Sequence, residues 1–226
     1  MSWFDHLLVF LFAVVVPYNG WRNFPKFLDM LKRDPVGTRR GVYLGNIIAL
    51  WVITLLVLGA WVLAGRPVAD LGLAPATGQS ALVSLAIVMV IIAIAIVFYR
   101  TIMELDKKYN WTFVPELLPR SKAELQLFLI LSATAGITEE ILFRGYLIWY
   151  LQQFGSLTFA VVASSMIFSI AHAYQGVKAI VIIFPIGLLF TFLYLYSGSL
   201  LPPILLHAAI NSYAGIYGRK IYGGEG

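Results

Sequence analysis

The stretch Thr138-Glu139-Glu140-Ile141-Leu142-Phe143-Arg144-Gly145 places two adjacent carboxylates and a guanidinium inside a long apolar segment. An ionised side chain at the centre of a bilayer costs about 3 kcal/mol or more, so such groups are rare there and mark functional sites. These three charged residues therefore indicate a functional site within the membrane.

The composition of the chain predicts an integral membrane protein. Hydrophobic residues make up 60% of the 226 residues and charged residues only 12%, with a mean hydropathy of +0.85. A soluble domain lacks the polar surface to cover so much apolar material, so we expect an all-α, polytopic membrane fold. The net charge of +5 is concentrated in loops, which indicates membrane topology rather than nucleic-acid binding. The lack of cysteine excludes disulfides, thiol catalysis and cysteine-ligated zinc.

The distribution of apolar runs and basic residues predicts about seven transmembrane helices and their orientation. Basic residues gather in the predicted loops 19–41 and 100–123, whereas 153–157 and 198–202 carry no charge. The positive-inside rule then places the N-terminus outside and the C-terminus in the cytoplasm. The first run is short for a membrane span. The helices are expected near 4–18, 42–64, 80–99, 124–152, 158–173, 178–197 and 203–218.

We expect a single transmembrane domain over residues 1–226. Within it, 1–123 holds the N-terminal helices and basic loops, 124–218 the helices with the chemical motifs, and 219–226 a polar tail. The pattern Ser121-Lys122-Ala123-Glu124 is a capping box and marks the start of the helix that carries the two glutamates.

The two glutamates have different geometric relations to the arginine. Glu140 and Arg144 are four residues apart, so they share a helix face and can form an ion pair. Glu139 is turned by roughly 100° from Glu140 and can point into a cavity. A purely structural ion pair also explains Glu140 and Arg144, but it leaves Glu139 without a partner.

The spacing along the next hairpin relates Glu139 to His172. Both residues lie the same number of positions from the predicted turn at Gly155-Ser156. An antiparallel hairpin therefore places them at one height, about 25 Å from the turn and near the cytoplasmic side of the membrane. Phe168 precedes His172 by four residues and shares its face, where packing is its expected role.

The last apolar run carries His207 and Asn211, four residues apart, as a polar stripe. Hydrogen bonding between helices is a structural alternative for such a stripe. A helix that began at the outer surface would place His207 well above Glu139. Because Pro202-Pro203 favours a helix start, we expect 198–202 to descend in extended form and the helix to begin inside the protein.

Three motifs, Glu139-Glu140-x-x-x-Arg144, Phe168-x-x-x-His172 and His207-x-x-x-Asn211, together resemble the CPBP family of intramembrane proteases. That family includes the type II CAAX prenyl endoproteases and bacterial Abi-like and lysostaphin-resistance-like proteins. The resemblance implies a cavity open to the cytoplasm of a prokaryotic cell. It implies that Glu139 and His172 activate a water, that His207 and Asn211 stabilise the oxyanion, and that Glu140 and Arg144 order the site.

The predicted function is thus an endopeptidase acting on a membrane-associated or lipidated peptide, with membrane lipid as its other partner and no nucleic acid. No cofactor is favoured, although Glu139, His172 and His207 form a sufficient set of ligands for catalytic zinc, and the family is often labelled metalloprotease. Two other functions stay open: a proton-coupled transporter, because intramembrane Glu and His build relays, and a non-catalytic immunity or scaffold protein.

Overall fold

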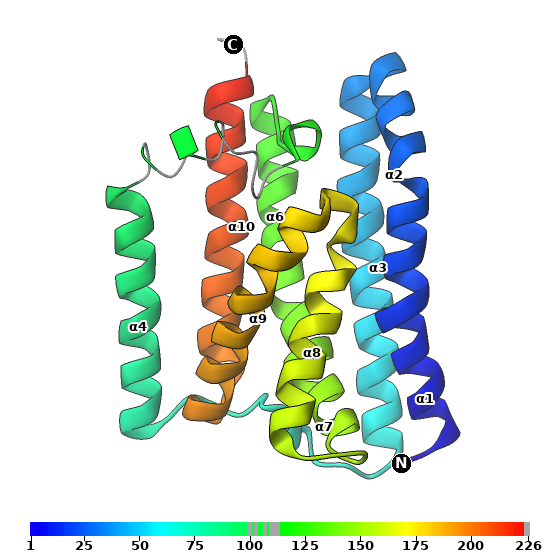
Figure 1. Cartoon of the computed structure of the whole chain (residues 1–226), viewed down its shortest axis with the longest axis vertical. Helices are drawn as coiled ribbons and strands as arrows, with labels where there is room; N and C mark the ends of the chain where they lie inside the picture. Colours follow the sequence, from blue (N-terminus) through cyan, green and yellow to red (C-terminus); the bar gives the residue numbers. More distant parts are fainter. Residues whose placement is uncertain (99–100, 102–103, 106–107, 109–113, 224–226) are drawn as a thin grey trace.

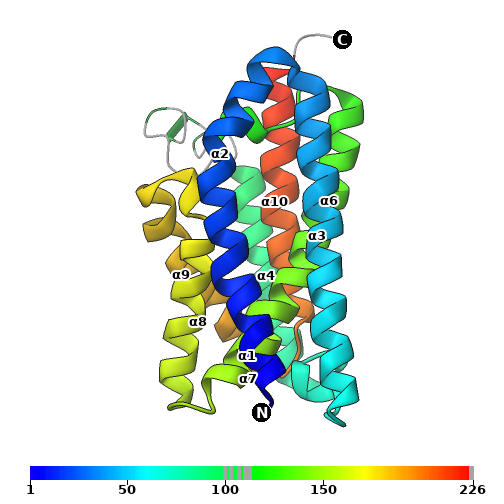
Figure 2. The same ribbon diagram turned by 90° about the vertical axis from the view of Figure 1, so that its right-hand side faces the viewer.

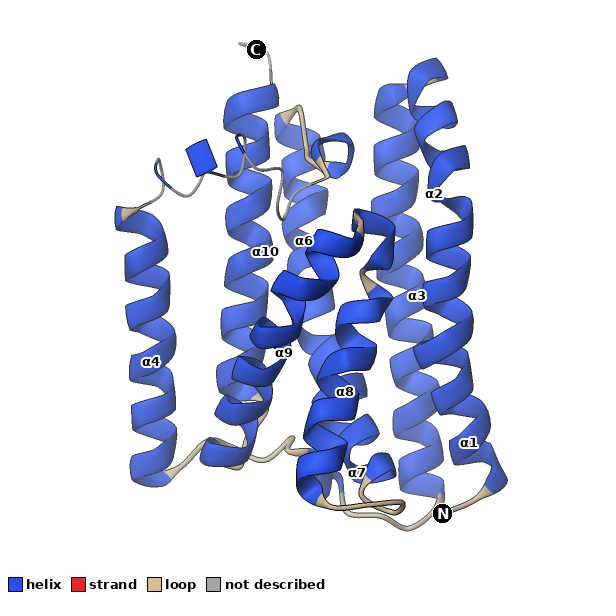
Figure 3. Ribbon diagram, viewed as in Figure 1, coloured by secondary structure: helices blue, strands red, loops and turns tan. Residues whose placement is uncertain are grey.

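The computed structural model describes residues 1–98, 101, 104–105, 108 and 114–223. The regular structure of these residues is entirely helical (Figure 3). The first half contains α1 Trp3–Phe10, the π-helical η1 Leu11–Val15, α2 Val16–Arg33, α3 Pro35–Leu63, the short η2 Val68–Leu71, α4 Gly78–Val97 and the short η3 Pro115–Leu117. The second half contains α6 Lys122–Glu140, the π-helical η4 Ile141–Leu147, α7 Ile148–Leu151, α8 Leu157–Ala171, the short η5 Ala173–Gln175, α9 Val177–Ser197 and α10 Leu201–Tyr222.

The helices confirm an all-α polytopic membrane fold. In the described part of the chain, five continuous helices are long and apolar enough to cross a membrane by length and composition. Another apolar helix, α8, is shorter, and α10 includes the polar His207 and Asn211. Each of the seven predicted apolar runs is thus occupied by a helix. The five long helices are Trp3–Arg33, Pro35–Leu63, Gly78–Val97, Lys122–Leu151 and Val177–Ser197.

The expectation of a basic loop over 19–41 is wrong, because this segment is a helical hairpin. The first helical rod continues through η1 and α2 to Arg33, and α3 begins two residues later. Asp34 separates them and caps α3, accepting a hydrogen bond from the backbone N–H of Gly37 at 2.9 Å, while Pro35 occupies the first turn. The polar residues of this segment therefore extend the helices instead of ending them.

The hairpin and the C-terminus share one end of the bundle, and the N-terminus lies at the other end (Figures 1 and 2). The basic residues of 19–41 thus lie at the same end as Arg219 and Lys220. The predicted basic loop 100–123 lies partly outside the described residues. The polar tail predicted from 219 is helical up to Tyr222, and residues 224–226 are outside the described part.

α6 starts at the predicted place, with the Ser121 half of the capping box present, whereas the Glu124 carboxylate accepts from the Arg120 N–H at 2.7 Å instead of from the Ser121 N–H. Ser121 is the N-cap, and its hydroxyl accepts a hydrogen bond from the Glu124 N–H at 3.2 Å. The Glu124 carboxylate is itself buried and pairs with Arg39 of α3 at 3.1 Å. The cap therefore also ties the helix of the two glutamates to α3.

Close packing of α6 against α10 sets the distance between the first and third motifs. The two helices run in opposite directions side by side (Figures 1 and 2). A Cβ added to Gly136 would lie 3.0 Å from the Ala208 backbone nitrogen and 3.0 Å from the Ile204 carbonyl oxygen. Small residues at a helix crossing allow the two backbones to approach in this way. Since Gly136 precedes Glu139 by one turn and Ala208 follows His207, this contact brings the two motifs together.

The segment before α10 is a tight turn rather than the expected extended descent. The turn begins at Gly198, and the Leu200 N–H donates to the Gly72 carbonyl at 2.9 Å. The turn packs against Gly145, where an added Cβ would lie 2.7 Å from the Leu71 carbonyl oxygen. Gly145 lies ten residues before the Gly155-Ser156 turn, so α10 does begin inside the protein. Because Gly145 has no side chain, Leu71 and the turn at Leu200 can pack directly against it.

We expect the Gly136→Val substitution to lower the stability of the fold by about 1–3 kcal/mol, because its methyl groups would collide with the α10 backbone. Thermal unfolding of the purified protein in detergent measures this loss. Gly59→Val in α3 is the matched control, since no atom lies within 4 Å of a Cβ at that position. Equal unfolding temperatures for the two variants would contradict the proposed close contact.

Candidate active site

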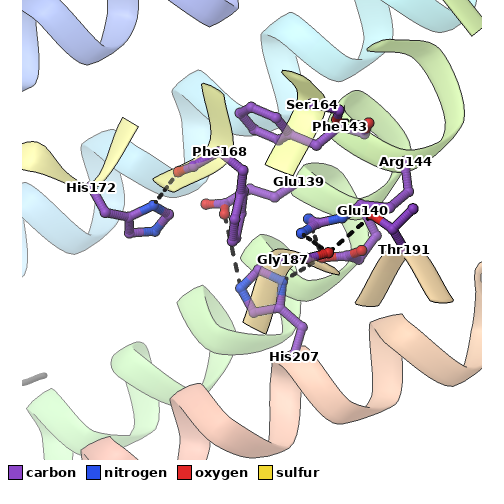
Figure 4. A network of polar contacts seen from close by, with 10 residues as sticks. All are labelled: Glu139, Glu140, Phe143, Arg144, Ser164, Phe168, His172, Gly187, Thr191 and His207. Atoms are coloured by element: carbon purple, nitrogen blue, oxygen red, sulfur yellow. Dashed lines mark hydrogen bonds and ion pairs between the residues drawn. The ribbon is translucent and has the colours of Figure 1, made fainter. Parts of the chain in front are cut away.

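The first motif lies where α6 passes into a π-helical stretch. Glu139 and Glu140 end α6, and Arg144 is in the middle of η4. Such π-helical segments are rare and often occur at functional sites. The hydroxyl of Ser164 in α8 donates a hydrogen bond to the Phe143 carbonyl oxygen at 2.7 Å, which supplies a further donor to the backbone of this stretch (Figure 4).

The predicted pair of Glu140 and Arg144 is present and completely buried. Arg144 Nη1 donates to Glu140 Oε1 at 2.9 Å, and both side chains have no exposed surface. Arg144 Nη2 also donates to the Gly187 carbonyl oxygen of α9 at 3.3 Å. The guanidinium carbon lies 4.1 Å from the centre of the Phe168 ring and 5.1 Å from that of Phe190. The arginine is therefore held by charge, a hydrogen bond and two aromatic faces, which compensates for its loss of hydration.

His207 is bound to the same carboxylate oxygen. Its Nδ1 lies 2.8 Å from Glu140 Oε1, so this nitrogen donates its proton to the ionised carboxylate. The imidazole stacks on Phe190, with ring centres 5.1 Å apart and planes 22° apart. These two contacts direct Nε2 towards Glu139, whose Oε2 lies 3.9 Å away (Figure 4).

Glu139 is more accessible than its neighbour. Its side chain is 17% exposed, whereas that of Glu140 is fully buried. Among the described residues, Glu139 Oε2 has no hydrogen-bond partner. The two adjacent glutamates thus differ as their angular separation predicts. Glu140 is buried inside the protein, and Glu139 lines a cavity.

His172 ends α8 and has a defined tautomer. Its Nδ1 lies 2.8 Å from the Phe168 carbonyl oxygen, and because a carbonyl only accepts, Nδ1 carries the proton. In the neutral ring, Nε2 is then left as an acceptor. The edge of Phe168 packs on the imidazole at 4.9 Å between centres. Phe168 therefore contacts His172 through its ring, as its spacing predicts, and also through its carbonyl oxygen.

One cavity of about 480 Å³ joins the predicted residues. Its wall includes Glu139 from α6, His172 from the end of α8, and His207 and Asn211 from α10. Most of the remaining wall is apolar and comes from α3, α4, α6, α9 and α10. A carboxylate, two imidazoles and an amide thus converge on one space in a largely apolar surrounding, an arrangement suited to proton transfer and to the stabilisation of a developing negative charge.

Several residues that support this site lie outside the three sequence motifs. Gly187 and Phe190 hold Arg144, and Phe190 also holds His207, but both lie in an apolar run with no distinguishing pattern. Tyr174 and Gln175 line the cavity directly after His172. The sequence signal that could have identified Tyr174 and Gln175 is their polar side chains close after the predicted site residue His172.

The described residues do not include a group of three or more His, Cys, Asp or Glu side chains placed to hold a metal ion. The possible zinc ligands Glu139, His172 and His207 line the same cavity, but they do not form such a group in this arrangement.

The fold and the cavity define a polytopic membrane protein with a polar site enclosed by its helices. Comparison with known families assigns the class more closely: the model of the family described as type II CAAX prenyl endopeptidase Rce1-like matches residues 121–213. The match contains all three motifs, so the C-terminal helices of the chain are similar to this protease family, in agreement with the resemblance to CPBP proteases. No curated protein and no solved structure gives a significant match to the chain.

We expect Arg144→Leu to destabilise the fold by about 3–5 kcal/mol, because it leaves the Glu140 carboxylate buried without its cation. Chemical or thermal unfolding in detergent measures the loss. Adding Glu140→Gln to this variant is expected to recover part of it by removing the unpaired charge.

The control for this prediction is Lys32→Leu, which breaks the exposed pair with Asp29 at 3.0 Å. Its effect should stay below about 1 kcal/mol, because water solvates both partners. A loss for Arg144→Leu as small as that of the control would show that the buried pair does not stabilise the protein.

Proposed function

We propose that this protein is an intramembrane endopeptidase that cleaves a membrane-associated peptide near the cytoplasmic face. The observation that supports this most is the convergence of Glu139, His172, His207 and Asn211 on one apolar cavity. These residues come from three separate helices, and a structural ion pair does not require such a meeting. The family match supports protease activity of this general kind.

In the proposed mechanism, Glu139 is the general base. Its carboxylate removes one proton from a water in the cavity. His172 Nε2 accepts a hydrogen bond from the other O–H of that water and so orients it. The water oxygen attacks the carbonyl carbon of the peptide. Glu139 then returns the proton to the nitrogen as the C–N bond breaks, which leaves a carboxylic acid and an amine.

His207 and Asn211 are the proposed donors to the oxyanion of the tetrahedral intermediate. The amide of Asn211 lies one helical turn beyond His207 on the same cavity wall. His207 in its protonated form carries a hydrogen on Nε2, because Nδ1 is directed to Glu140. One such donor contributes about 3–4 kcal/mol to transition-state stabilisation in a site that excludes water.

Glu140 and Arg144 are proposed to act as positioning residues rather than catalytic ones. Neither is exposed to the cavity, and both hold groups that are exposed to it. Through its bond to His207 Nδ1, Glu140 determines which nitrogen of that ring can reach the reacting atoms. Arg144 neutralises Glu140, so the carboxylate can remain buried and ionised.

The charge distribution supports an orientation with the N-terminus outside and the C-terminus in the cytoplasm. The basic hairpin of α2 and α3 lies at the C-terminal end of the bundle (Figure 1). The cavity extends towards this end, since its wall includes Tyr43 of α3 and Leu117 and Leu118 before α6. A peptide or lipidated peptide is therefore proposed to enter from the cytoplasmic side and to place its apolar part against the apolar wall.

We expect Glu139→Gln to abolish cleavage of fluorogenic, membrane-anchored peptides by the purified protein in detergent, because glutamine cannot accept the proton of the water. The matched control is Glu116→Gln, a carboxylate of η3 that is not part of the cavity wall. This control should retain wild-type activity.

The same comparison separates the proposed protease from the other candidate functions. Equal cleavage by wild type and Glu139→Gln would refute the role of the carboxylate. Failure of both to cleave any peptide, with equal peptide binding, would favour an immunity or scaffold protein. Proton-coupled solute uptake into liposomes, abolished by Glu139→Gln without any cleavage, would favour a transporter.

We expect cleavage to persist after treatment with a chelator, and metal analysis of the active protein to find no stoichiometric zinc. The reason is geometric: both imidazoles leave Nε2 available, but the side chains of Glu139, His172 and His207 do not converge as a metal-binding group in this arrangement. Stoichiometric zinc whose removal abolishes cleavage, and whose return restores it, would show that the metal-dependent mechanism is correct.

A further inference from the structure

Tyr174 lines the proposed active-site cavity but has no role in the mechanism above. It lies in η5, the single turn that joins α8 to α9 directly after His172. The turn is held by the Gln175 N–H, which donates to the His172 carbonyl at 2.9 Å. The position of the tyrosine relative to His172 is therefore set by the local backbone.

The ring of Tyr174 lies between His172 and the N-terminal helical rod. It stacks on the imidazole with planes 27° apart and centres 6.3 Å apart. The Tyr174 ring also contacts the ring of Phe24 in α2, and the two ring centres lie 5.6 Å apart. Phe24 therefore supports Tyr174, and Tyr174 in turn packs on His172.

The hydroxyl of Tyr174 has a hydrogen available for donation. In the bond with Gln175, the amide Nε2 donates to the phenol oxygen at 3.0 Å, so the phenol hydrogen is not used there. Burial raises the pKa of the Tyr174 phenol, and the nearby charge of Glu139 adds to this effect. The phenol thus stays protonated at neutral pH.

A peptide in this cavity needs donors of this kind. Its main-chain carbonyls lose water on entry, and a carbonyl left without a hydrogen-bond donor weakens binding. Beside His172 the wall also includes Gln175, whose amide donates to the Tyr174 hydroxyl, whereas the proposed oxyanion donors, His207 and Asn211, lie on α10. A protonated phenol beside His172 can satisfy a carbonyl away from the bond that is cut.

We propose that Tyr174 is a substrate-binding residue whose phenol donates a hydrogen bond to a main-chain carbonyl of the bound peptide, while its ring, supported by Phe24, orients His172. This inference rests on the proposed peptidase function. It assigns two separable tasks to one side chain: the hydroxyl binds substrate, and the ring positions the imidazole.

The two tasks predict different kinetic effects. Tyr174→Phe keeps the ring and removes the donor, so KM for the best-cleaved peptide of the fluorogenic library should rise about 3- to 10-fold with kcat within twofold. Tyr174→Leu also removes the stacked ring, so kcat should fall at least 10-fold. Phe24→Leu should lower kcat without changing KM, and Phe24→Tyr should restore it.

Tyr196→Phe is the matched control, because this tyrosine is exposed on α9 and is not part of the cavity wall. It should leave both kinetic constants unchanged, and all variants should unfold at the wild-type temperature to within a few degrees. Unchanged KM in Tyr174→Phe would overturn the role of the hydroxyl. Unchanged kcat in Tyr174→Leu would overturn the role of the ring.

A binding experiment separates this proposal from the proposed function. The affinity of a fluorescein-labelled peptide with a farnesylated C-terminal cysteine is measured for Glu139→Gln and for Glu139→Gln combined with Tyr174→Phe. Weaker binding to the double variant, about 3- to 10-fold, is the expected result. That result without any cleavage by wild type would support the hydroxyl's role and overturn the peptidase function. Equal or absent binding to the two variants would overturn the hydroxyl's role.

Discussion

The buried carboxylate of Glu140 is the interaction on which the rest of the site depends. One of its oxygens accepts hydrogen bonds from Arg144 and from His207, in a region from which solvent is excluded. A buried ion pair is not by itself a strong source of stability, because the loss of hydration offsets much of the attraction. Its main consequence here is specificity: an arrangement that separates α10 from α6 removes the His207 hydrogen bond from this buried carboxylate.

That requirement explains the close packing around the site. His207 reaches Glu140 only because α6 and α10 approach closely at Gly136, and because α10 begins inside the protein, beside Gly145. The same network leaves Glu139 at the cavity, with one oxygen that has no hydrogen-bond partner among the described residues. Glu140 also keeps one buried oxygen without such a partner, but of the two glutamates only Glu139 lines the cavity.

Paired charges also connect the site to both ends of the bundle. At the N-terminal end, Asp5 binds Arg66 at 2.8 Å and accepts a hydrogen bond from Tyr146 in the same π-helical stretch that carries Arg144. At the other end, Glu124 pairs with Arg39. These contacts hold the N-terminal helices against the helix of the two glutamates. Although the family match begins at residue 121, the N-terminal half thus contributes structurally to the site and, through Phe24, reaches Tyr174.

The sequence alone determined the fold class and the seven helical segments, and it predicted the candidate site residues that line the cavity, because helix periodicity and the cost of buried charge are local properties. It also related Glu139 to His172 through the spacing about one turn. Only the tertiary structure showed that one oxygen of Glu140 binds both Arg144 and His207, that residues 19–41 are helical, and that Phe190 and Tyr174 support the imidazoles. Such contacts join helices distant in the chain, and apolar or aromatic residues within apolar runs carry no pattern that reveals which neighbour they will meet.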